Sequence, residues 1–429
     1  MTEREIKVDA LARVEGEGAL YVRLRGNEIE KVEFRIFEPP RFFEALLVGR
    51  EAGEAPDITS RICGICPIAY VMSASMAVEK ALGIEVTPEI RDLRRLVYCG
   101  EWIQSHVLHA VMLHAPDFFG LHDAIQIAQA EPELVRNGLR LKKLGNTIME
   151  VVGGRSVHPV NTRVGGFYRA PGMDAVQAMI PELEWGAAAA RDMVLAFANF
   201  DFPEDEGDYH FVSLVHPEQY PILEGRLGSN SGLNIPVEAF SEYFVEEHVA
   251  RSNALHGRMR DGSAYLVGPL ARYANNFERF TPSCKATARA AGLGEVVNNP
   301  FKSILVRLIE VQYACEEAAR LANAYVPPNP PFIEVAPRSG EGQSCTEAPR
   351  GICHHTYRLD DTGHITFAQI VPPTSQNQPQ IEVDLTRVVA ANIDMTDTDL
   401  KWRCEQTIRN YDPCISCATH FLKLTVDRV

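Results

Sequence analysis

Residues 61–67 read Arg-Ile-Cys-Gly-Ile-Cys-Pro, and residues 412–417 read Asp-Pro-Cys-Ile-Ser-Cys. Each stretch carries two cysteines three positions apart, a spacing that lets a tight turn direct both thiolates toward one ion. The two stretches lie near opposite ends of a chain of 429 residues. If the two pairs share a site, the ends of the chain must meet. We therefore expect one continuous architecture, although a chain of this length would often divide into several domains.

The spacing of the cysteines alone leaves several kinds of site open. Structural zinc, an iron–sulfur cluster and a redox dithiol all use such pairs, and nickel also accepts soft thiolate ligands. On spacing alone, zinc and iron–sulfur rank first, although zinc pairs usually lie much closer together in the sequence. The other six cysteines are scattered, and ten cysteines in a large chain with no secretion signal do not indicate a disulfide framework.

Composition narrows the class of protein. There are 57 acidic and 42 basic residues, giving a formal charge of −15. No basic run is present that could neutralise phosphates, so we expect no nucleic-acid partner. No apolar stretch is long enough to span a bilayer. Residues 1–12 are charged and lack the apolar core of a secretion signal, which favours a cytoplasmic location.

Apolar periodicity predicts a mostly helical centre. Alternation over residues 20–36 on either side of Gly26-Asn27 predicts a β-hairpin near the N-terminus. Helical spacing of apolar residues predicts three helices, at about residues 88–113, 175–198 and 302–325.

The C-terminal part is predicted to contain strands and one more helix. Residues 365–371 and 381–385 are apolar runs typical of strands. Thr396 and Asp399 match a capping box that would open a helix carrying Leu400 and Cys404. The prediction is an α+β fold that is mostly helical, with small β-sheets near the two ends of the chain.

The residues around the cysteines resemble the two signature motifs of nickel-iron hydrogenase large subunits. These motifs are residues 61–67 and Asp-Pro-Cys-Ile-Ser-Cys-Ala-Thr-His at 412–420, and they occur in the family's order. The resemblance extends from Arg-Val-Glu-Gly at 13–16 to His420 and covers nearly the whole chain. It implies a single large-subunit domain over residues 1–420, built as a helical bundle with small sheets. It also implies an oxidoreductase that cleaves H2 reversibly and heterolytically.

The same resemblance implies two metal sites. Cys63 and Cys414 would bind nickel terminally, while Cys66 and Cys417 would bridge nickel to an iron that carries carbon monoxide and cyanide. Glu44, in Arg-Phe-Phe-Glu at 41–44, and His420 would bind a second cation, magnesium or iron. A carboxylate suits such a hard cation.

The resemblance further assigns residues around the metals. Glu15 would be the first proton carrier. Arg350, in Glu-Ala-Pro-Arg-Gly at 347–351, would place a guanidinium beside the open metal position, held by Asp412 and Asp117.

The pocket of the diatomic ligands would be lined by Pro349, Val371, Pro372 and Thr374. Many relatives have a hydroxyl residue where Pro373 stands, and proline has no N–H to donate. A contact to cyanide at this point would therefore come from Thr374 or from a backbone amide. His158 matches a family position near the partner subunit, although a buried, hydrogen-bonded histidine is an equally good reading.

Partners and processing are also implied. Residues 421–429 resemble a C-terminal propeptide that a maturation endopeptidase removes after His420. The other six cysteines form no pattern that could bind iron–sulfur clusters, so an iron–sulfur small subunit is expected. The resemblance also implies further flavin and iron–sulfur subunits that pass electrons to NAD(P) or another soluble carrier, as in cytoplasmic sulfhydrogenase-type enzymes. Two other classes stay open: a metal-free subunit of the respiratory-complex type, which would lack the cysteine pairs, and a zinc-stabilised structural protein, which zinc content would reveal.

Overall fold

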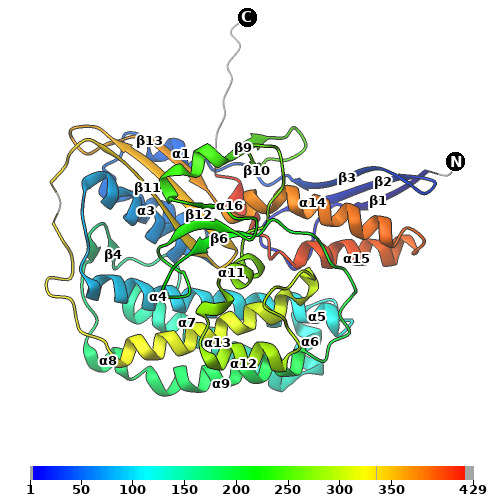
Figure 1. Cartoon of the computed structure of the whole chain (residues 1–429), viewed down its shortest axis with the longest axis horizontal. Helices are drawn as coiled ribbons and strands as arrows, with labels where there is room; N and C mark the ends of the chain where they lie inside the picture. Colours follow the sequence, from blue (N-terminus) through cyan, green and yellow to red (C-terminus); the bar gives the residue numbers. More distant parts are fainter. Residues whose placement is uncertain (1–2, 335, 421–429) are drawn as a thin grey trace, which may run out of the picture.

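The computed structural model of the chain describes residues 3–334 and 336–420 (Figure 1). Its centre is a bundle of four long helices that lie side by side: α4 (Pro88–Val107), α7 (Pro132–Gly153), α9 (Ile180–Phe197) and α13 (Ser303–Asn323). The predicted helices at about 88–113, 175–198 and 302–325 are confirmed. The first continues past α4 as a π-helix (Leu108–His114), and the second is divided into α8 (Met173–Gln177) and α9.

Local sequence explains how α4 begins and how closely it packs against α7. The Thr87 hydroxyl accepts the Ile90 N–H at the start of α4, and Pro88 occupies the first turn, where no N–H partner is needed. Gly100 of α4 and Gly145 of α7 face each other, and a Cβ at Gly145 would lie 2.5 Å from the Gly100 carbonyl oxygen. The two glycines therefore let the backbones of α4 and α7 pack directly against each other.

Two three-stranded antiparallel sheets flank the bundle. The first is β1 (Glu3–Val8), β2 (Gly18–Arg25) and β3 (Glu28–Ile36), and it extends to one side of the molecule beside α14 (Pro373–Ala391) and α15 (Asp397–Arg409) (Figure 1). The second is β11 (Gly340–Ala348), β12 (Gly351–Leu359) and β13 (Ile365–Val371), and it packs on α3 (Pro67–Leu82). The predicted hairpin, the strand at 365–371 and the Thr396 cap are confirmed.

The strand predicted at 381–385 is wrong, because these residues lie within α14. Ile381, Leu385, Val388 and Val389 are buried at helical spacing, and a short apolar run cannot by itself separate a strand from a buried helix.

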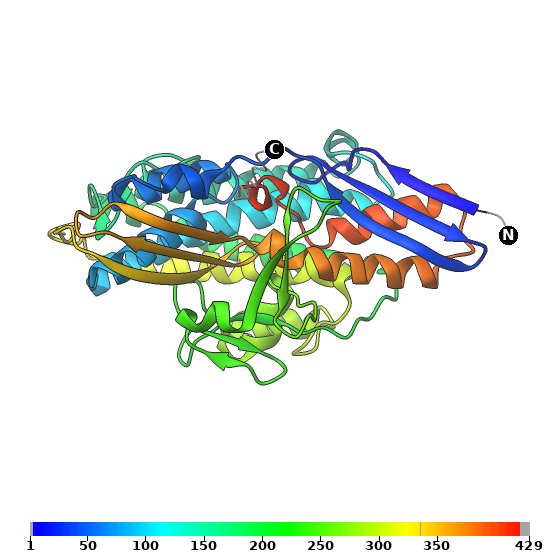
Figure 2. The ribbon, with the colours of Figure 1, turned by 90° about the horizontal axis from the view of Figure 1, so that it is seen from above.

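Three small antiparallel sheets in the middle of the chain were not predicted, and two of them form the lobe that projects from the bundle in Figure 2. The strands are β4 (Thr162–Arg163), β5 (Gly166–Phe167), β6 (Val212–Val215), β7 (Arg226–Ser229), β8 (Asn234–Ile235), β9 (Phe244–His248) and β10 (Leu255–Met259). Most are too short to show alternation. The remaining α-helices are α1 (Phe43–Leu47), α2 (Ala55–Thr59), α5 (Ala115–Phe118), α6 (Ala124–Ala130), α10 (Phe240–Tyr243), α11 (Pro269–Asn276), α12 (Pro282–Ala290) and α16 (Ile415–Ala418).

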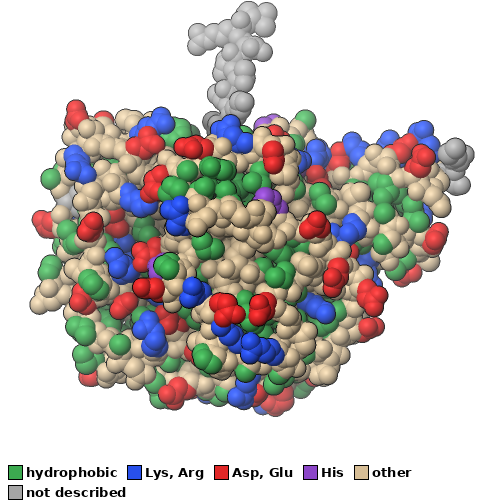
Figure 3. Space-filling view, viewed as in Figure 1, with side chains coloured by type: hydrophobic (Ala, Val, Ile, Leu, Met, Phe, Trp, Pro, Cys, Tyr) green, Lys and Arg blue, Asp and Glu red, His purple; other side chains and the backbone are tan. Residues whose placement is uncertain are grey.

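The two ends of the chain meet in the interior. Glu15 and Cys414 form a parallel β-bridge, in which the Ile415 N–H donates to the Glu15 carbonyl at 3.0 Å. One continuous hydrophobic core includes residues from Ile6 to Ala418. Figure 3 shows acidic and basic side chains interspersed over the displayed face. Within the described residues, no helix is long and apolar enough to cross a membrane.

Candidate metal centre

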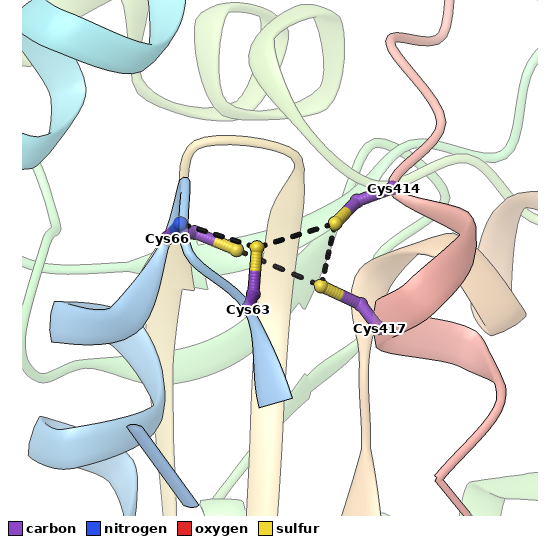
Figure 4. Close-up of side chains that lie close together, drawn as sticks. All are labelled: Cys63, Cys66, Cys414 and Cys417. Carbon is purple, nitrogen blue, oxygen red and sulfur yellow. Dashed lines mark hydrogen bonds between the residues drawn. The ribbon is translucent and has the colours of Figure 1, made fainter. Parts of the chain in front are cut away.

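The four paired cysteines converge on one point (Figure 4). The Sγ–Sγ distances are 3.4 Å between Cys63 and Cys414, 3.7 Å between Cys66 and Cys417, and 2.7 Å between Cys414 and Cys417. All four sulfurs lie within 4.8 Å of one another, and all four residues are buried free thiols. The expectation that the two ends of the chain share a site is therefore met.

Two chain segments present these thiols. Cys63 and Cys66 lie in the loop that leads into α3, and Cys414 and Cys417 flank the start of α16. The Cys63 sulfur accepts the N–H groups of Ile65 and Cys66, each at 3.3 Å. These bonds fix the turn and favour negative charge on the sulfur.

The electrostatics of the four thiols suit a site for a cation. Hydrogen bonds from Cys414 and the other two thiols lower the pKa of Cys63 well below its usual range, whereas burial raises the pKa of Cys414. Four thiols in one buried volume cannot all ionise without positive charge between them. Four soft donors that ionise together only around a cation fit a thiolate-bound transition metal.

Arg350 supplies fixed positive charge beside the cluster. Its Nε donates to the Asp412 carbonyl at 2.6 Å, and its Nη2 donates to the Asp412 carboxylate at 3.0 Å. The guanidinium is buried, and its charge contributes to lowering the pKa of Cys63. The expected contact between Arg350 and Asp412 is thus present. Burial raises the pKa of Asp412, an effect that Arg350 opposes.

The expected contact between Asp117 and Arg350 is not what the structure records. Asp117 instead binds Arg13 Nη2 at 2.5 Å, and it accepts two bonds from Arg409 at 2.7 and 2.8 Å. Two cations already occupy this carboxylate, which lies on the short helix α5. Asp117 therefore anchors the 13–16 loop through Arg13, whose φ of 62° is in the left-handed region.

That loop brings Glu15 to the cysteines. Its carboxylate accepts the Ser416 N–H at 3.0 Å, and its carbonyl accepts the Ile415 N–H at 3.0 Å. Burial raises the pKa of Glu15, and the charge of nearby Cys63 raises it further. A carboxyl whose pKa is moved upward toward neutrality, next to a metal site, is suited to exchange protons.

Glu44 and His420 also lie together, with Glu44 Oε1 3.8 Å from His420 Nε2. The His420 ring has Nδ1 at 2.5 Å from the Cys417 carbonyl and Nε2 at 2.7 Å from the Ile370 carbonyl. A neutral imidazole has only one N–H. If Nδ1 donates to Cys417, the Nε2 lone pair faces the oxygens of Ile370 and Glu44. One nitrogen and two oxygens facing each other in this way fit a hard cation.

Sequence reasoning missed two contributors to this second site. Ile370 offers only its backbone carbonyl, so its identity carries no signal. Glu246, on β9, is half-buried and accepts the Ser375 hydroxyl at 3.0 Å. Burial, together with the charge of Glu44, raises the pKa of Glu246 to about 8.

The expected ligand-pocket residues are all buried: Pro349, Val371, Pro372 and Thr374. The Thr374 hydroxyl accepts the Cys414 N–H at 3.1 Å. Pro373 is the first residue of α14, a position where a missing N–H costs nothing.

Two further residues join the segments around the cysteines. The Arg41 N–H donates to the Thr419 carbonyl at 2.8 Å, and its guanidinium donates to the carbonyls of Ile62 and Ser416. Arg41 therefore links the two cysteine segments. His158 has its Nδ1 2.8 Å from the Ser60 carbonyl and is half-buried.

A model of the family described as nickel-dependent hydrogenase matches residues 41–140 and 260–420, which include all four cysteines. The chain belongs to the nickel-dependent hydrogenase family. It is accordingly an oxidoreductase that acts on H2.

Relatives of this hydrogenase match along nearly their whole length. Sulfhydrogenase 2 subunit alpha of Pyrococcus furiosus is 34% identical, over 98% of this chain and 100% of the relative. Sulfhydrogenase 1 subunit alpha of the same organism is 31% identical, over 98% of each chain. The HoxS subunit beta of the NAD-reducing hydrogenase of Cupriavidus necator is 27% identical, over 98% of this chain and 95% of the relative.

Solved structures confirm the fold of the hydrogenase. A chain of an NAD+-reducing [NiFe]-hydrogenase in the H2-reduced state superposes with a TM-score of 0.87, at 24% identity, covering 97% of this chain and 99% of the other. The [NiFeSe]-hydrogenase of Dm. baculatum superposes with a TM-score of 0.79, at 20% identity, over 98% of this chain. The predicted α+β large-subunit fold is therefore correct.

Proposed function

We propose that this hydrogenase chain is the catalytic large subunit of a nickel-iron enzyme, with residues 1–420 as its single domain. The observation that carries the proposal is the buried cluster of four thiols within 4.8 Å, assembled from both ends of the chain. Cys63 and Cys414 would hold nickel, and Cys66 and Cys417 would hold both nickel and iron. When bound, this centre, with carbon monoxide and cyanide on iron, supplies the redox chemistry that splits H2 into protons and electrons.

The chain's own residues handle charge and protons. Arg350 keeps a guanidinium beside the thiolates, which offsets their negative charge, and Asp412 holds it in place. Glu15 takes a proton at its carboxylate and passes it outward, because its raised pKa lets it both accept and release a proton. Pro349, Val371 and Pro372 exclude water from the pocket, and Thr374 orients the Cys414 backbone.

A second cation, magnesium or iron, would be held by Glu44, His420 and the Ile370 carbonyl. We further propose that a maturation endopeptidase removes residues 421–429 after His420. That segment lies outside the described residues. His420 itself is 1% exposed, so cleavage directly after it would leave the new carboxylate at the edge of the second site.

Electrons must leave through another chain, because the six remaining cysteines are dispersed through the core. An iron–sulfur small subunit is the partner that this chemistry requires, and His158 would lie near it. The names of the relatives, which include sulfhydrogenase subunits and a subunit of an NAD-reducing enzyme, support further subunits and NAD(P) as acceptor. We propose that these further subunits carry flavin and iron–sulfur clusters. We also propose a cytoplasmic location.

Elemental analysis of the complex, purified without oxygen from its native host, tests the proposal. We expect nickel and iron together on this chain, with H2-dependent reduction of an acceptor dye. Zinc without nickel, in material already cut after His420, would mean that the cysteines serve structure. That result would overturn the proposal.

A further inference from the structure

A fully buried arginine holds the backbone that precedes Arg350. Arg272 lies on α11, which packs between the β11–β12 hairpin and α13 (Figure 1). Its Nη1 donates to the Ala348 carbonyl at 2.8 Å and to the Glu347 carboxylate at 2.9 Å, and its Nη2 donates to the Pro349 carbonyl at 2.9 Å. Three contacts thus fall on the three residues directly before Arg350.

The remaining donors of Arg272 anchor it to the helical bundle. Nε and Nη2 each donate to the Glu310 carboxylate of α13 at 2.7 Å. A guanidinium has five N–H groups, and all five of these bonds end on Glu310 or on residues 347–349. The Glu310 carboxylate also accepts the Tyr220 hydroxyl at 2.7 Å.

Other contacts restrain the same short stretch. The Trp102 indole N–H donates to the Glu347 carbonyl at 2.9 Å, and the Leu214 N–H donates to the Glu347 carboxylate at 2.7 Å. Gly268, at the start of α11, touches the turn itself, because a Cβ there would lie 2.7 Å from the Arg350 carbonyl. Residues 347, 348 and 349 therefore each have a fixed carbonyl oxygen.

We propose that Arg272 is a positioning residue for the hydrogenase reaction: it fixes residues 347–349 and thereby holds the Arg350 guanidinium beside the cysteine cluster. The inference rests on the proposed role of Arg350. Buried ion pairs add little net stability compared with apolar residues of the same size. A group of one arginine and two glutamates inside the protein is better explained by the fixed geometry it gives to the 347–350 turn.

Arg272→Lys tests this inference, because lysine keeps the charge but has only three donors and cannot make the planar set of bonds. Arg94→Lys is the matched control: Arg94 is equally buried and forms a two-bond ion pair with Glu79, with no contact to residues 347–350. The measurements on the purified complex are nickel and iron content, thermal unfolding, the kcat and KM for H2, and the nickel EPR spectrum.

We expect Arg272→Lys to lower kcat at least tenfold and to shift the nickel EPR g-values, with metal content unchanged, while Arg94→Lys lowers only the unfolding temperature. Equal effects of the two variants on kcat and EPR would show a merely structural role and overturn the inference. If Arg272→Lys does not mature, Trp102→Phe removes the indole bond to the Glu347 carbonyl and keeps an aromatic ring beside the Arg272 guanidinium. It should lower kcat and shift the g-values in the same direction, and wild-type values would refute the inference. Failure of the proposed function would differ, because the wild type itself would then lack nickel.

Discussion

Replacing Glu15 with glutamine should stop proton transfer while leaving the fold and the metal cluster intact. The carboxylate oxygen of Glu15 accepts the Ser416 N–H at 3.0 Å, and a glutamine amide oxygen can accept the same bond. Burial and the charge of Cys63 raise the pKa of Glu15, so the substitution also removes a charge that the folded state holds at a cost. Stability should therefore not fall.

The loss should appear in turnover alone. A positioned acid or base contributes about 10²- to 10⁴-fold to rate, so we expect Glu15→Gln to lower the kcat of H2 oxidation by about 100-fold or more, equivalent to about 2.7 kcal/mol. The assay is H2-dependent dye reduction, measured together with nickel content and the nickel EPR spectrum. Glu15→Asp keeps the carboxylate on a shorter side chain, so its kcat should lie between those of the wild type and Glu15→Gln.

Glu38→Gln is the matched control for this experiment. Glu38 accepts the Glu17 N–H at 3.2 Å beside the same loop, so its substitution should leave kcat unchanged. A Glu15→Gln enzyme that keeps more than about a tenth of the wild-type kcat would have an activation barrier raised by less than about 1.4 kcal/mol. Protons would then leave by another group, and the reasoning would be refuted. Loss of nickel in Glu15→Gln would show instead that the carboxylate supports the cluster.

Three further outcomes follow from the geometry. Asp117→Asn leaves Arg13 and Arg409 without their buried carboxylate and should lower the free energy of unfolding by about 3–5 kcal/mol, measured by thermal or denaturant unfolding. The control is Asp57→Asn, because Asp57 forms an exposed pair with Arg61. This control should change the free energy of unfolding by less than about 1 kcal/mol. Gly145→Ala forces a Cβ to 2.5 Å from the Gly100 carbonyl oxygen, whereas a Cβ at Gly53 would meet open space. We expect Gly145→Ala to lower the free energy of unfolding by about 1–3 kcal/mol and Gly53→Ala to leave it almost unchanged. Equal unfolding temperatures of the two variants would contradict the close packing of α4 on α7. Glu246 has its pKa raised from 4.5 to about 8, so the favourable contribution of its protonated carboxyl to the free energy of unfolding is complete below pH 4.5 and is lost as the pH rises through 8. After chelator treatment, the unfolding temperature of Glu246→Gln should therefore exceed that of the wild type by an amount that grows over this pH interval, and added Mg²⁺ should reduce the difference. A difference that stays constant with pH would contradict the raised pKa.

Much of the architecture could be predicted because local chemistry and tertiary structure agree. The Gly26-Asn27 turn lies between strands whose apolar faces alternate, and Thr396 caps α15 as its sequence indicates. The cysteine motifs located the site because each pair of ligands and its flanking residues are contiguous in the sequence. Arg350 and Asp412 were paired correctly for the same reason.

The errors arose where partners come from distant segments. Asp117 was expected to bind Arg350, but Arg13 and Arg409 occupy it. Residues 381–385 satisfy strand and helix patterns equally, and only burial within α14 decides between them. Arg272 and Glu246 had no local signal, since each acts through side chains or carbonyls remote in sequence. The mid-chain strands are held by pairing over a few residues, which periodicity does not detect.

The parallel bridge between Glu15 and Cys414 has a consequence for biosynthesis. Ribosomes add about 5–20 residues each second, so the thiols at 63 and 66 emerge tens of seconds before those at 414 and 417. Throughout that interval the early pair has neither its partner thiols nor the Ile415 N–H that closes the bridge. A metal delivered during translation would find half a site. Loading must therefore follow translation, and a prematurely terminated chain that lacks 414–417 cannot capture the metal in a complete set of ligands.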